Sequence, residues 1–151
     1  MNRRIATLAV AAALGFAAAG AQATTIGECQ MLAADAMGTV QGNSDYFTSN
    51  NRINECLVKM VESSAKGKPA TSISTLSGPM SKDECSMYNY LSSVDSKLEQ
   101  AKLGDAKSVI DGMVAKIDTL YGTGKLIDPG YTDVRAAAAA VQTCVGQLLS
   151  Q

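Results

Sequence analysis

Four cysteines constrain this chain more than any other feature of its sequence. They stand at Cys29, Cys56, Cys85 and Cys144. An even number of isolated cysteines in a short exported chain indicates a disulfide framework. Zinc binding is the alternative, but the sequence has no CxxC pair and no histidine. We therefore expect two disulfides, and neither a metal nor any other cofactor.

The N-terminus indicates that the chain is exported. Arg3 and Arg4 are followed by an uncharged, mostly apolar run from Ile5 to Ala19, and Ala21-Gln22-Ala23 supplies the small residues that signal peptidase requires. A membrane anchor fits this segment less well. As a helix the apolar run is only about 22 Å long, which is shorter than the roughly 30 Å hydrocarbon core of a bilayer. We predict a cleaved signal peptide over 1–23 and a periplasmic or extracellular protein.

The remaining residues, 24–151, have the size of one domain with one hydrophobic core. Of the 13 Lys and Arg residues, two lie in the signal peptide, which leaves 11 against 14 Asp and Glu. The charges are interspersed, so no basic stripe is available for nucleic acid or for an anionic membrane surface. We expect neither nucleic-acid binding nor stable membrane insertion.

Apolar residues recur at three- and four-residue spacing in most of the chain, and no alternating strand pattern competes. The sequence predicts an all-α fold, a compact bundle of four to five helices braced by two disulfides. The predicted helices cover 26–40, 53–67, 82–103, 105–121 and about 132–149.

The helices over 82–103 and 105–121 form a predicted αα-hairpin. Ser81 and Glu84 have the spacing of a capping box at its start, and Gly104 can adopt the left-handed conformation that ends a helix. The helix 105–121 carries the widest apolar stripe, which extends from Ala106 to Tyr121, so we expect it to be central.

Residues 66–80 are rich in Ser, Thr, Gly, Lys and Pro. A flexible, exposed loop is the predicted structure, and a short extended piece around Ile73 and Leu76 is the alternative.

A strict up-and-down bundle places Cys29 level with Cys85, and Cys56 level with Cys144. This arrangement favours the pairs Cys29–Cys85 and Cys56–Cys144. Pairing in sequence order, Cys29–Cys56 and Cys85–Cys144, is a close alternative if the 66–80 loop reroutes the chain.

The sequence does not favour an enzyme. Without histidine, the usual base for a Ser or Cys nucleophile is missing, and no SxxK or GxSxG motif occurs. A carboxylate-dependent hydrolase is a remote alternative, through the pairs Asp83 with Glu84, Asp95 with Glu99, and Asp111 with Asp118. We interpret Asp95 and Glu99 as a solvated helix face.

The six methionines after the signal peptide lack MxM or MxxM spacing and are interpreted as core residues rather than copper ligands. Tyr88 and Tyr90 cannot share a helix face, so one of them should point outward. Together with Tyr46 they are the candidate interface residues.

These observations predict an exported, non-enzymatic protein-interaction module, of the inhibitor, immunity or secreted-antigen type, whose partner is another protein. The alternative is a binder of a small apolar ligand or lipid in the bundle core. An Ala-rich run, Ala136 to Ala140, also makes a homodimer possible.

Overall fold

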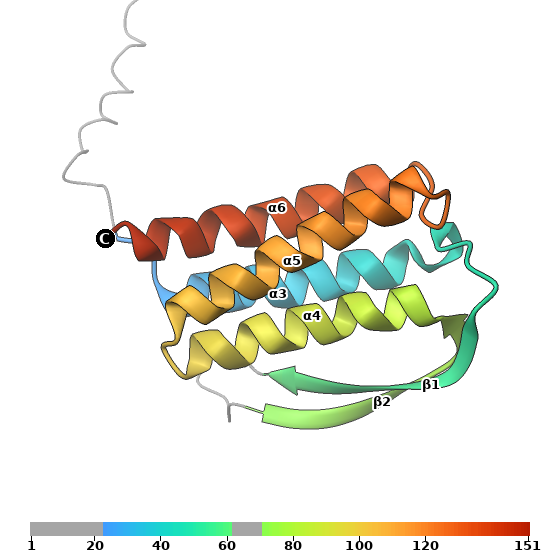
Figure 1. Cartoon of the computed structure of the whole chain (residues 1–151). Helices are drawn as coiled ribbons and strands as arrows, with labels where there is room; N and C mark the ends of the chain where they lie inside the picture. The colour runs from blue at the N-terminus through green and yellow to red at the C-terminus, as the bar shows by residue number, and fades with distance from the viewer. Residues whose placement is uncertain (1–22, 62–70) are drawn as a thin grey trace, which may run out of the picture.

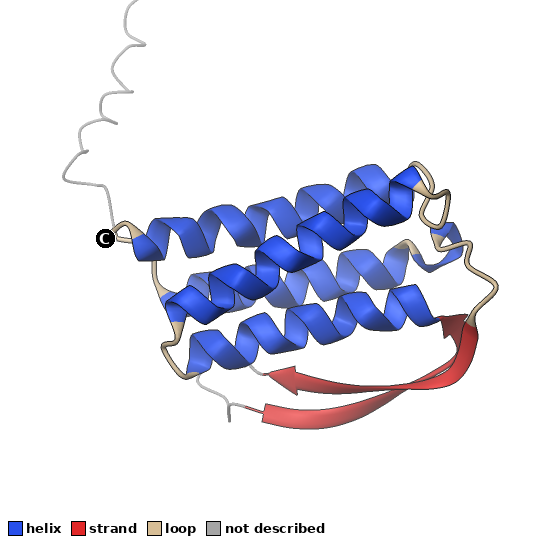
Figure 2. Ribbon diagram, viewed as in Figure 1, coloured by secondary structure: helices blue, strands red, loops and turns tan. Residues whose placement is uncertain are grey.

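The computed structural model describes residues 23–61 and 71–151. In this part of the chain four helices lie side by side, and a two-stranded hairpin lies along one side of them (Figures 1 and 2). The bundle predicted from the sequence is confirmed. The elements are α3 (Ile26–Gly42), a 3-10 turn η2 (Ser44–Tyr46), β1 (Arg52–Val61), β2 (Thr71–Ser81), α4 (Lys82–Glu99), α5 (Leu103–Gly122) and α6 (Gly130–Leu149).

The predicted signal peptide lies outside the described residues except for Ala23. Thr24, the first residue after the predicted cleavage site, contacts the end of the chain. Its backbone N–H donates to Gln151 Oε1 at 2.7 Å, and its hydroxyl donates to Gln147 Oε1 at 3.1 Å. The two ends of the described domain are therefore adjacent.

Helix α3 begins with a capping box that sequence analysis missed, although Thr25 and Glu28 have its spacing. The backbone N–H of Glu28 donates to the Thr25 hydroxyl at 3.1 Å, and the Thr25 N–H donates to the Glu28 carboxylate at 2.8 Å. The helix buries a face of small and apolar residues, which are Cys29, Ala33, Ala36, Met37 and Val40.

The αα-hairpin of α4 and α5 is confirmed, but the reversal between them differs from the prediction. Ala101, not Gly104, has the left-handed backbone, with φ of 58°. The Ala101 N–H donates to Leu98 O at 2.9 Å and the Lys102 N–H to Lys97 O at 2.8 Å, the two bonds of a Schellman motif. Gly104 lies in the first turn of α5.

The predicted helix over 53–67 is wrong for its described part. Residues 52–61 form strand β1, which pairs antiparallel with β2, with Cys56 opposite Leu76 and Val58 opposite Ser74. Cys56 and Val58 are buried whereas Leu57 is 64% exposed, so the side chains alternate as in a half-buried strand. A short apolar run fits both periods, and here the pairing with β2 decided the structure.

The flexible loop predicted over 66–80 is also wrong from Thr71 onward, where the chain forms β2. Residues 66–70 lie outside the described part. The extended piece considered around Ile73 and Leu76 is the structure observed, within a longer strand.

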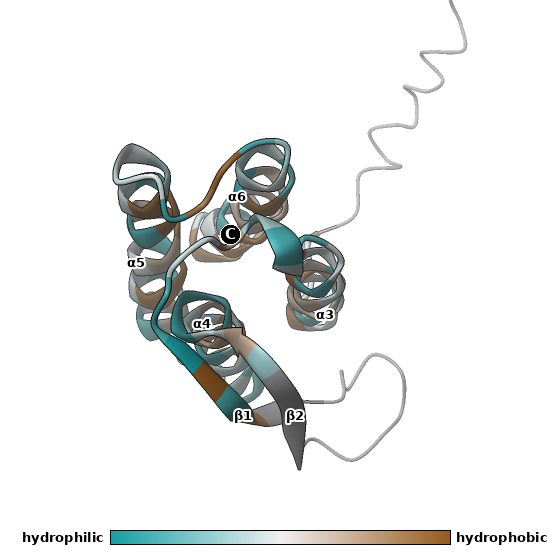
Figure 3. Ribbon diagram, turned by 90° about the vertical axis from the view of Figure 1, so that its right-hand side faces the viewer, coloured by the Kyte–Doolittle hydropathy of each residue, from teal (hydrophilic) through white to brown (hydrophobic). Residues whose placement is uncertain are grey.

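The hairpin lies against α4, on the side of that helix away from α6 (Figures 1 and 3). Helix α4 packs against α3, α5 and β1 and is the most enclosed helix of the bundle. The apolar stripe of α5 is buried as expected from Ala106 to Leu120, but Tyr121 at its end is 47% exposed.

Both predicted disulfide pairings are wrong. The disulfides join Cys29 to Cys144 and Cys56 to Cys85, with Cα–Cα distances of 5.6 and 5.7 Å. The physical reason is the hairpin. Two strands in place of one helix reverse the direction of every later helix (Figure 1), so Cys144 returns to the end of the bundle where Cys29 lies, as their disulfide requires.

We expect the two disulfides to contribute unequally to stability. Cys29 and Cys144 are 115 residues apart and Cys56 and Cys85 are 29 apart, so the longer closure removes more entropy from the unfolded chain. Replacing the first pair by Ala should cost about 1 kcal/mol more than replacing the second. Urea unfolding of the two double variants measures this, and the reverse order would contradict the entropic argument.

The strain at Ala101 gives a second prediction. Glycine adopts the left-handed conformation without the steric cost that alanine has, so Ala101→Gly should stabilise the protein by about 0.5–1 kcal/mol. The control is Ala136→Gly at an exposed position inside α6, which should destabilise by about 1 kcal/mol. Thermal unfolding of both variants is the measurement. If both substitutions raised the stability, or both lowered it, the assignment of a strained left-handed backbone to Ala101 would be refuted.

Candidate interaction site

The three tyrosines expected at an interface lie in three different surroundings. Tyr88 is 2% exposed, so its predicted interface role is wrong. Tyr90 is half-buried against the core in the groove between α4 and α5, close to Gly112. Tyr46 is half-buried at the end of the bundle where α5 joins α6.

Tyr88 is a core residue because its hydroxyl has a partner inside the protein. It donates to the carboxylate of Glu84, one turn earlier on α4, and burial raises the pKa of Tyr88 well above its usual range. Glu84 is 3% exposed and also accepts a hydrogen bond from Ser44 Oγ at 2.5 Å. Glu84 therefore ties η2 to α4 instead of closing the predicted capping box, and Ser81 caps the helix through the N–H of Asp83 at 3.0 Å.

Exposed and half-buried aromatic and apolar side chains gather around the connection between α5 and α6. We call this the aromatic patch, formed by Tyr46, Tyr121, Ile127 and Tyr131. Figure 3 views the bundle from this end. The rings of Tyr121 and Tyr131 stack with centroids 3.9 Å apart and planes 15° apart. Tyr121 is 47% and Ile127 43% exposed, so the patch presents apolar surface to water.

The backbone under the patch is held by contacts between distant parts of the chain. Phe47 and Leu126 form an isolated antiparallel bridge, and the Ile127 N–H donates to Tyr46 O at 3.1 Å. A Cβ at Gly130 would lie only 2.4 Å from the Cβ of Tyr46, so this position requires glycine. The segment that carries Tyr46 is thus fixed on the start of α6.

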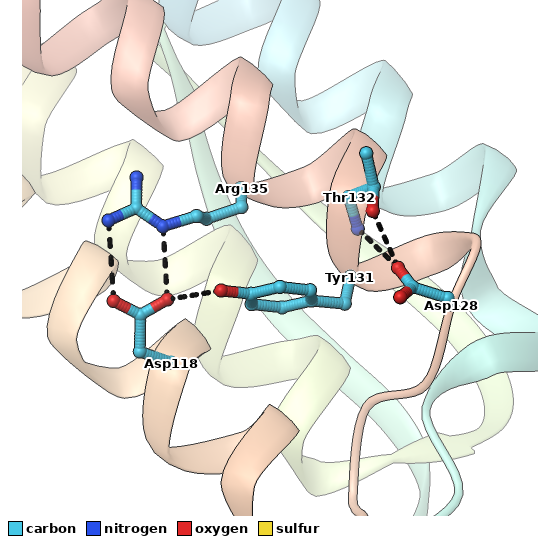
Figure 4. Close-up of polar contacts among 5 residues, drawn as sticks. All are labelled: Asp118, Asp128, Tyr131, Thr132 and Arg135. Carbon is cyan, nitrogen blue, oxygen red and sulfur yellow. Dashed lines mark hydrogen bonds and ion pairs between the residues drawn. The ribbon is translucent and has the colours of Figure 1, made fainter.

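A second network fixes Tyr131 (Figure 4). Its hydroxyl donates to Asp118 Oδ1 at 2.8 Å, and Arg135 donates to the same carboxylate through Nε at 3.0 Å and Nη2 at 3.3 Å. The hydrogen bonds from Arg135 and Tyr131 lower the pKa of Asp118, and the bond to Asp118 raises the pKa of Tyr131. The three groups hold the stacked ring in one orientation.

Asp128 fixes the start of α6 beside this network. Its carboxylate accepts hydrogen bonds from the Thr132 N–H at 3.0 Å and from the Thr132 hydroxyl at 2.6 Å (Figure 4). Such a carboxylate satisfies a free N–H of the first helical turn and opposes the positive end of the helix dipole.

The carboxylates of the predicted pairs Asp95 with Glu99 and Asp111 with Asp118 lie in different surroundings. Asp111 accepts from Lys107 at 2.7 Å and from Gln142 at 2.9 Å, and these bonds lower its pKa. Asp95 is 2% exposed, so its interpretation as part of a solvated face is wrong, although Glu99 is exposed. A glycosidase-type pair needs one carboxyl that retains its proton beside one that is ionised, both within reach of substrate.

Four of the six methionines, Met37, Met80, Met87 and Met113, are buried, as core residues should be. Met31 is 41% exposed. In residues 23–61 and 71–151 no three Asp, Glu or Cys side chains are grouped so that they could hold a metal ion. No helix of the same residues combines the length and apolar character needed to cross a membrane.

Comparison of the chain with protein-family models, curated proteins and solved structures finds no match.

The buried role of Tyr88 is tested by removing its hydroxyl. Tyr88→Phe leaves the buried Glu84 carboxylate with one hydrogen bond fewer and should cost about 1–3 kcal/mol of stability. Tyr90→Phe, at the half-buried tyrosine two residues later, is the matched control and should change stability by less than about 0.5 kcal/mol. Equal effects in urea unfolding would contradict the core assignment.

Proposed function

We propose that the chain is an exported, non-enzymatic protein-interaction module that binds a partner protein through the aromatic patch. The observation that carries this proposal is the rigid tyrosine pair, exposed Tyr121 stacked on half-buried Tyr131, beside exposed Ile127. Export is supported by the two disulfides, which belong to an oxidising compartment.

The composition of the patch is that of an interface centre. Tyrosine and arginine are enriched among the residues that dominate binding energy, and the patch combines Tyr46, Tyr121 and Tyr131 with Arg135 at its edge. The fold of the bundle leaves Tyr121 and Ile127 exposed, so burial in the core does not account for these residues. A partner that covers them gains the free energy of burying their apolar surface.

Rigidity supports the same function. A flexible side chain loses rotamer freedom when a partner binds, at a cost of about 0.5–1.5 kcal/mol for each residue. Tyr131 is already held by its stack on Tyr121 and by its hydrogen bond to Asp118. Tyr131 therefore loses most of its side-chain conformational entropy on folding rather than on binding, as in the pre-organised binding surfaces of matured antibodies.

The non-enzymatic part of the proposal is supported by the state of the carboxylates. Asp111 and Asp118 are engaged by cationic side chains, Lys107 and Arg135, that lower their pKa values. Glu84 is buried and holds structural hydrogen bonds. Neither Asp111 nor Asp118 is therefore suited to donate a proton to a substrate near neutral pH, and Glu84 is buried out of reach of a substrate.

The alternative function, binding of a small apolar ligand, has one supporting observation. A hollow of about 540 Å³ lies between α3 and α6. Its lining includes Leu32, Ala136, Ala139 and Ala140. The bundle core itself is filled by the buried stripe of α5, so a ligand would sit in this surface hollow rather than in the core.

The test uses the chain exported with its own leader and recovered as the mature protein beginning at Thr24. A photo-reactive benzoylphenylalanine at position 127 should crosslink one partner protein in the producing cell. The same residue at position 149 is the matched control, because Leu149 is 46% exposed but lies at the other end of α6. Equal crosslinking at both positions would contradict the assigned surface.

Once the partner is identified, the dissociation constant of the complex measures how much each anchor residue contributes to binding. Tyr121→Ala should weaken binding by about 30-fold or more, as expected of a central aromatic anchor, while Leu149→Ala leaves it unchanged. A small molecule retained on the mature protein in native mass spectrometry, with no crosslink at position 127, would support the alternative function instead.

A further inference from the structure

Asp95 is a buried carboxylate whose position the proposed interaction does not explain. It lies on α4 and is 2% exposed. Among the described residues, its Oδ1 is a buried side-chain oxygen that lacks a hydrogen-bond partner. Buried polar atoms are nearly always paired, and burying an unpaired ionised carboxylate is costly.

The groups around Asp95 do not neutralise a negative charge. From α3 the facing polar residue is Gln30, whose side chain hydrogen-bonds Asp95 and also donates from Nε2 to Glu99 Oε1 at 2.8 Å. Glu99, one turn further along α4, adds a second negative charge. The salt bridges of the described residues join Lys107 to Asp111 and Arg135 to Asp118, and neither includes Asp95.

The other elements packed on α4 contribute apolar side chains. The buried residues of α5 are Ala106, Ile110, Met113, Val114, Ile117 and Leu120. The buried residues of β1 are Cys56 and Val58. Asp95 is therefore buried on a helix whose neighbouring elements bury apolar side chains, and the groups that interact with its carboxyl are the uncharged Gln30 amide and Glu99.

We propose that Asp95 is a proton-controlled latch between α3 and α4, which tightens their packing when it is protonated and loosens it when it is ionised. The latch is independent of the aromatic patch, which lies around the α5–α6 connection. Its geometric basis is the buried Asp95–Gln30–Glu99 cluster that bridges the two helices.

The direction of the effect follows from burial. Burial raises the pKa of Asp95 and Glu99 adds a smaller increase, while the hydrogen bond from Gln30 opposes them; together they move the pKa from 3.8 to about 7 in the folded protein. The folded state thus holds this proton more tightly than the unfolded chain does. The stabilisation is complete below about pH 4 and is lost as the pH rises through about 7.

The Cys29–Cys144 disulfide limits what the latch can release. Cys29 precedes Gln30 on α3, and its disulfide joins this part of α3 to α6. Ionisation of Asp95 therefore loosens the contact between α3 and α4 without freeing α3 from the bundle. Above neutral pH we expect a local opening rather than unfolding of the domain.

The first measurement is urea unfolding of the mature, disulfide-intact protein at pH 5, 6.5 and 8. Between pH 5 and 8 the folding equilibrium constant of the wild type should fall by roughly tenfold to a hundredfold. Asp95→Asn, which cannot ionise, should lose most of this dependence and be more stable than the wild type at pH 8. Asp35→Asn, at an exposed position of α3, is the control and should keep the wild-type profile.

The same pH profile in Asp95→Asn and in the wild type would overturn the proposal. If the variant does not fold, NMR titration of the Asp95 carboxyl carbon in the wild type decides the question. A midpoint near 7 supports the latch, and a midpoint near 4 overturns it.

Amide hydrogen exchange then locates the opening. After correction for the intrinsic rate, protection in 26–42 should fall by about tenfold more than protection in 130–149 when the pH rises from 5 to 8. A uniform loss of protection over both segments would overturn the local latch.

Discussion

The burial of α4 against three neighbours at once is the constraint on which the rest of this structure depends. Helix α3, helix α5 and strand β1 all pack on it, and the Cys56–Cys85 disulfide fixes the hairpin to its first turns. A helix so enclosed keeps only part of its surface in water, with Lys82, Asn89 and Glu99 exposed. Glu84, Tyr88 and Asp95 are consequently buried, and each must find a partner or retain a proton.

The buried carboxyl groups near the two ends of α4 are stabilised in different ways. Near its start, the Glu84 carboxylate accepts hydrogen bonds from the hydroxyls of Tyr88 and Ser44, so each of its two oxygens has a donor. Near its end, Asp95 has the Gln30 amide and a like-charged neighbour, Glu99. The first arrangement is a structural tie, whereas the second makes the packing of the helices depend on pH.

The end of the bundle that carries the aromatic patch is built from contacts between distant segments. The Phe47–Leu126 bridge and the Tyr46–Gly130 contact bring the chain that follows α3 onto the connection between α5 and α6. These contacts position Tyr46 beside Ile127 and Tyr131, although about 80 residues separate them in the sequence.

Of the interface residues expected from the sequence, only Tyr46 belongs to this patch. Tyr121 was expected in the core because it continues the apolar stripe of α5, and Ile127 carried no local signal.

The amino-acid sequence by itself determined the helical segments and the composition of the core. Residue periodicity, the Ser81 cap and the cysteine count depend on local spacing, and the structure confirms four of the five predicted helices and the presence of two disulfides. Only the tertiary structure decided the conformation of 52–61, because its apolar residues fit both a helix and a strand until β2 pairs with it. That choice reversed the direction of every later helix and so set the cysteine pairing. Burial of Asp95 and exposure of Tyr121 were settled in the same way, since the face that a helix buries depends on which neighbours surround it.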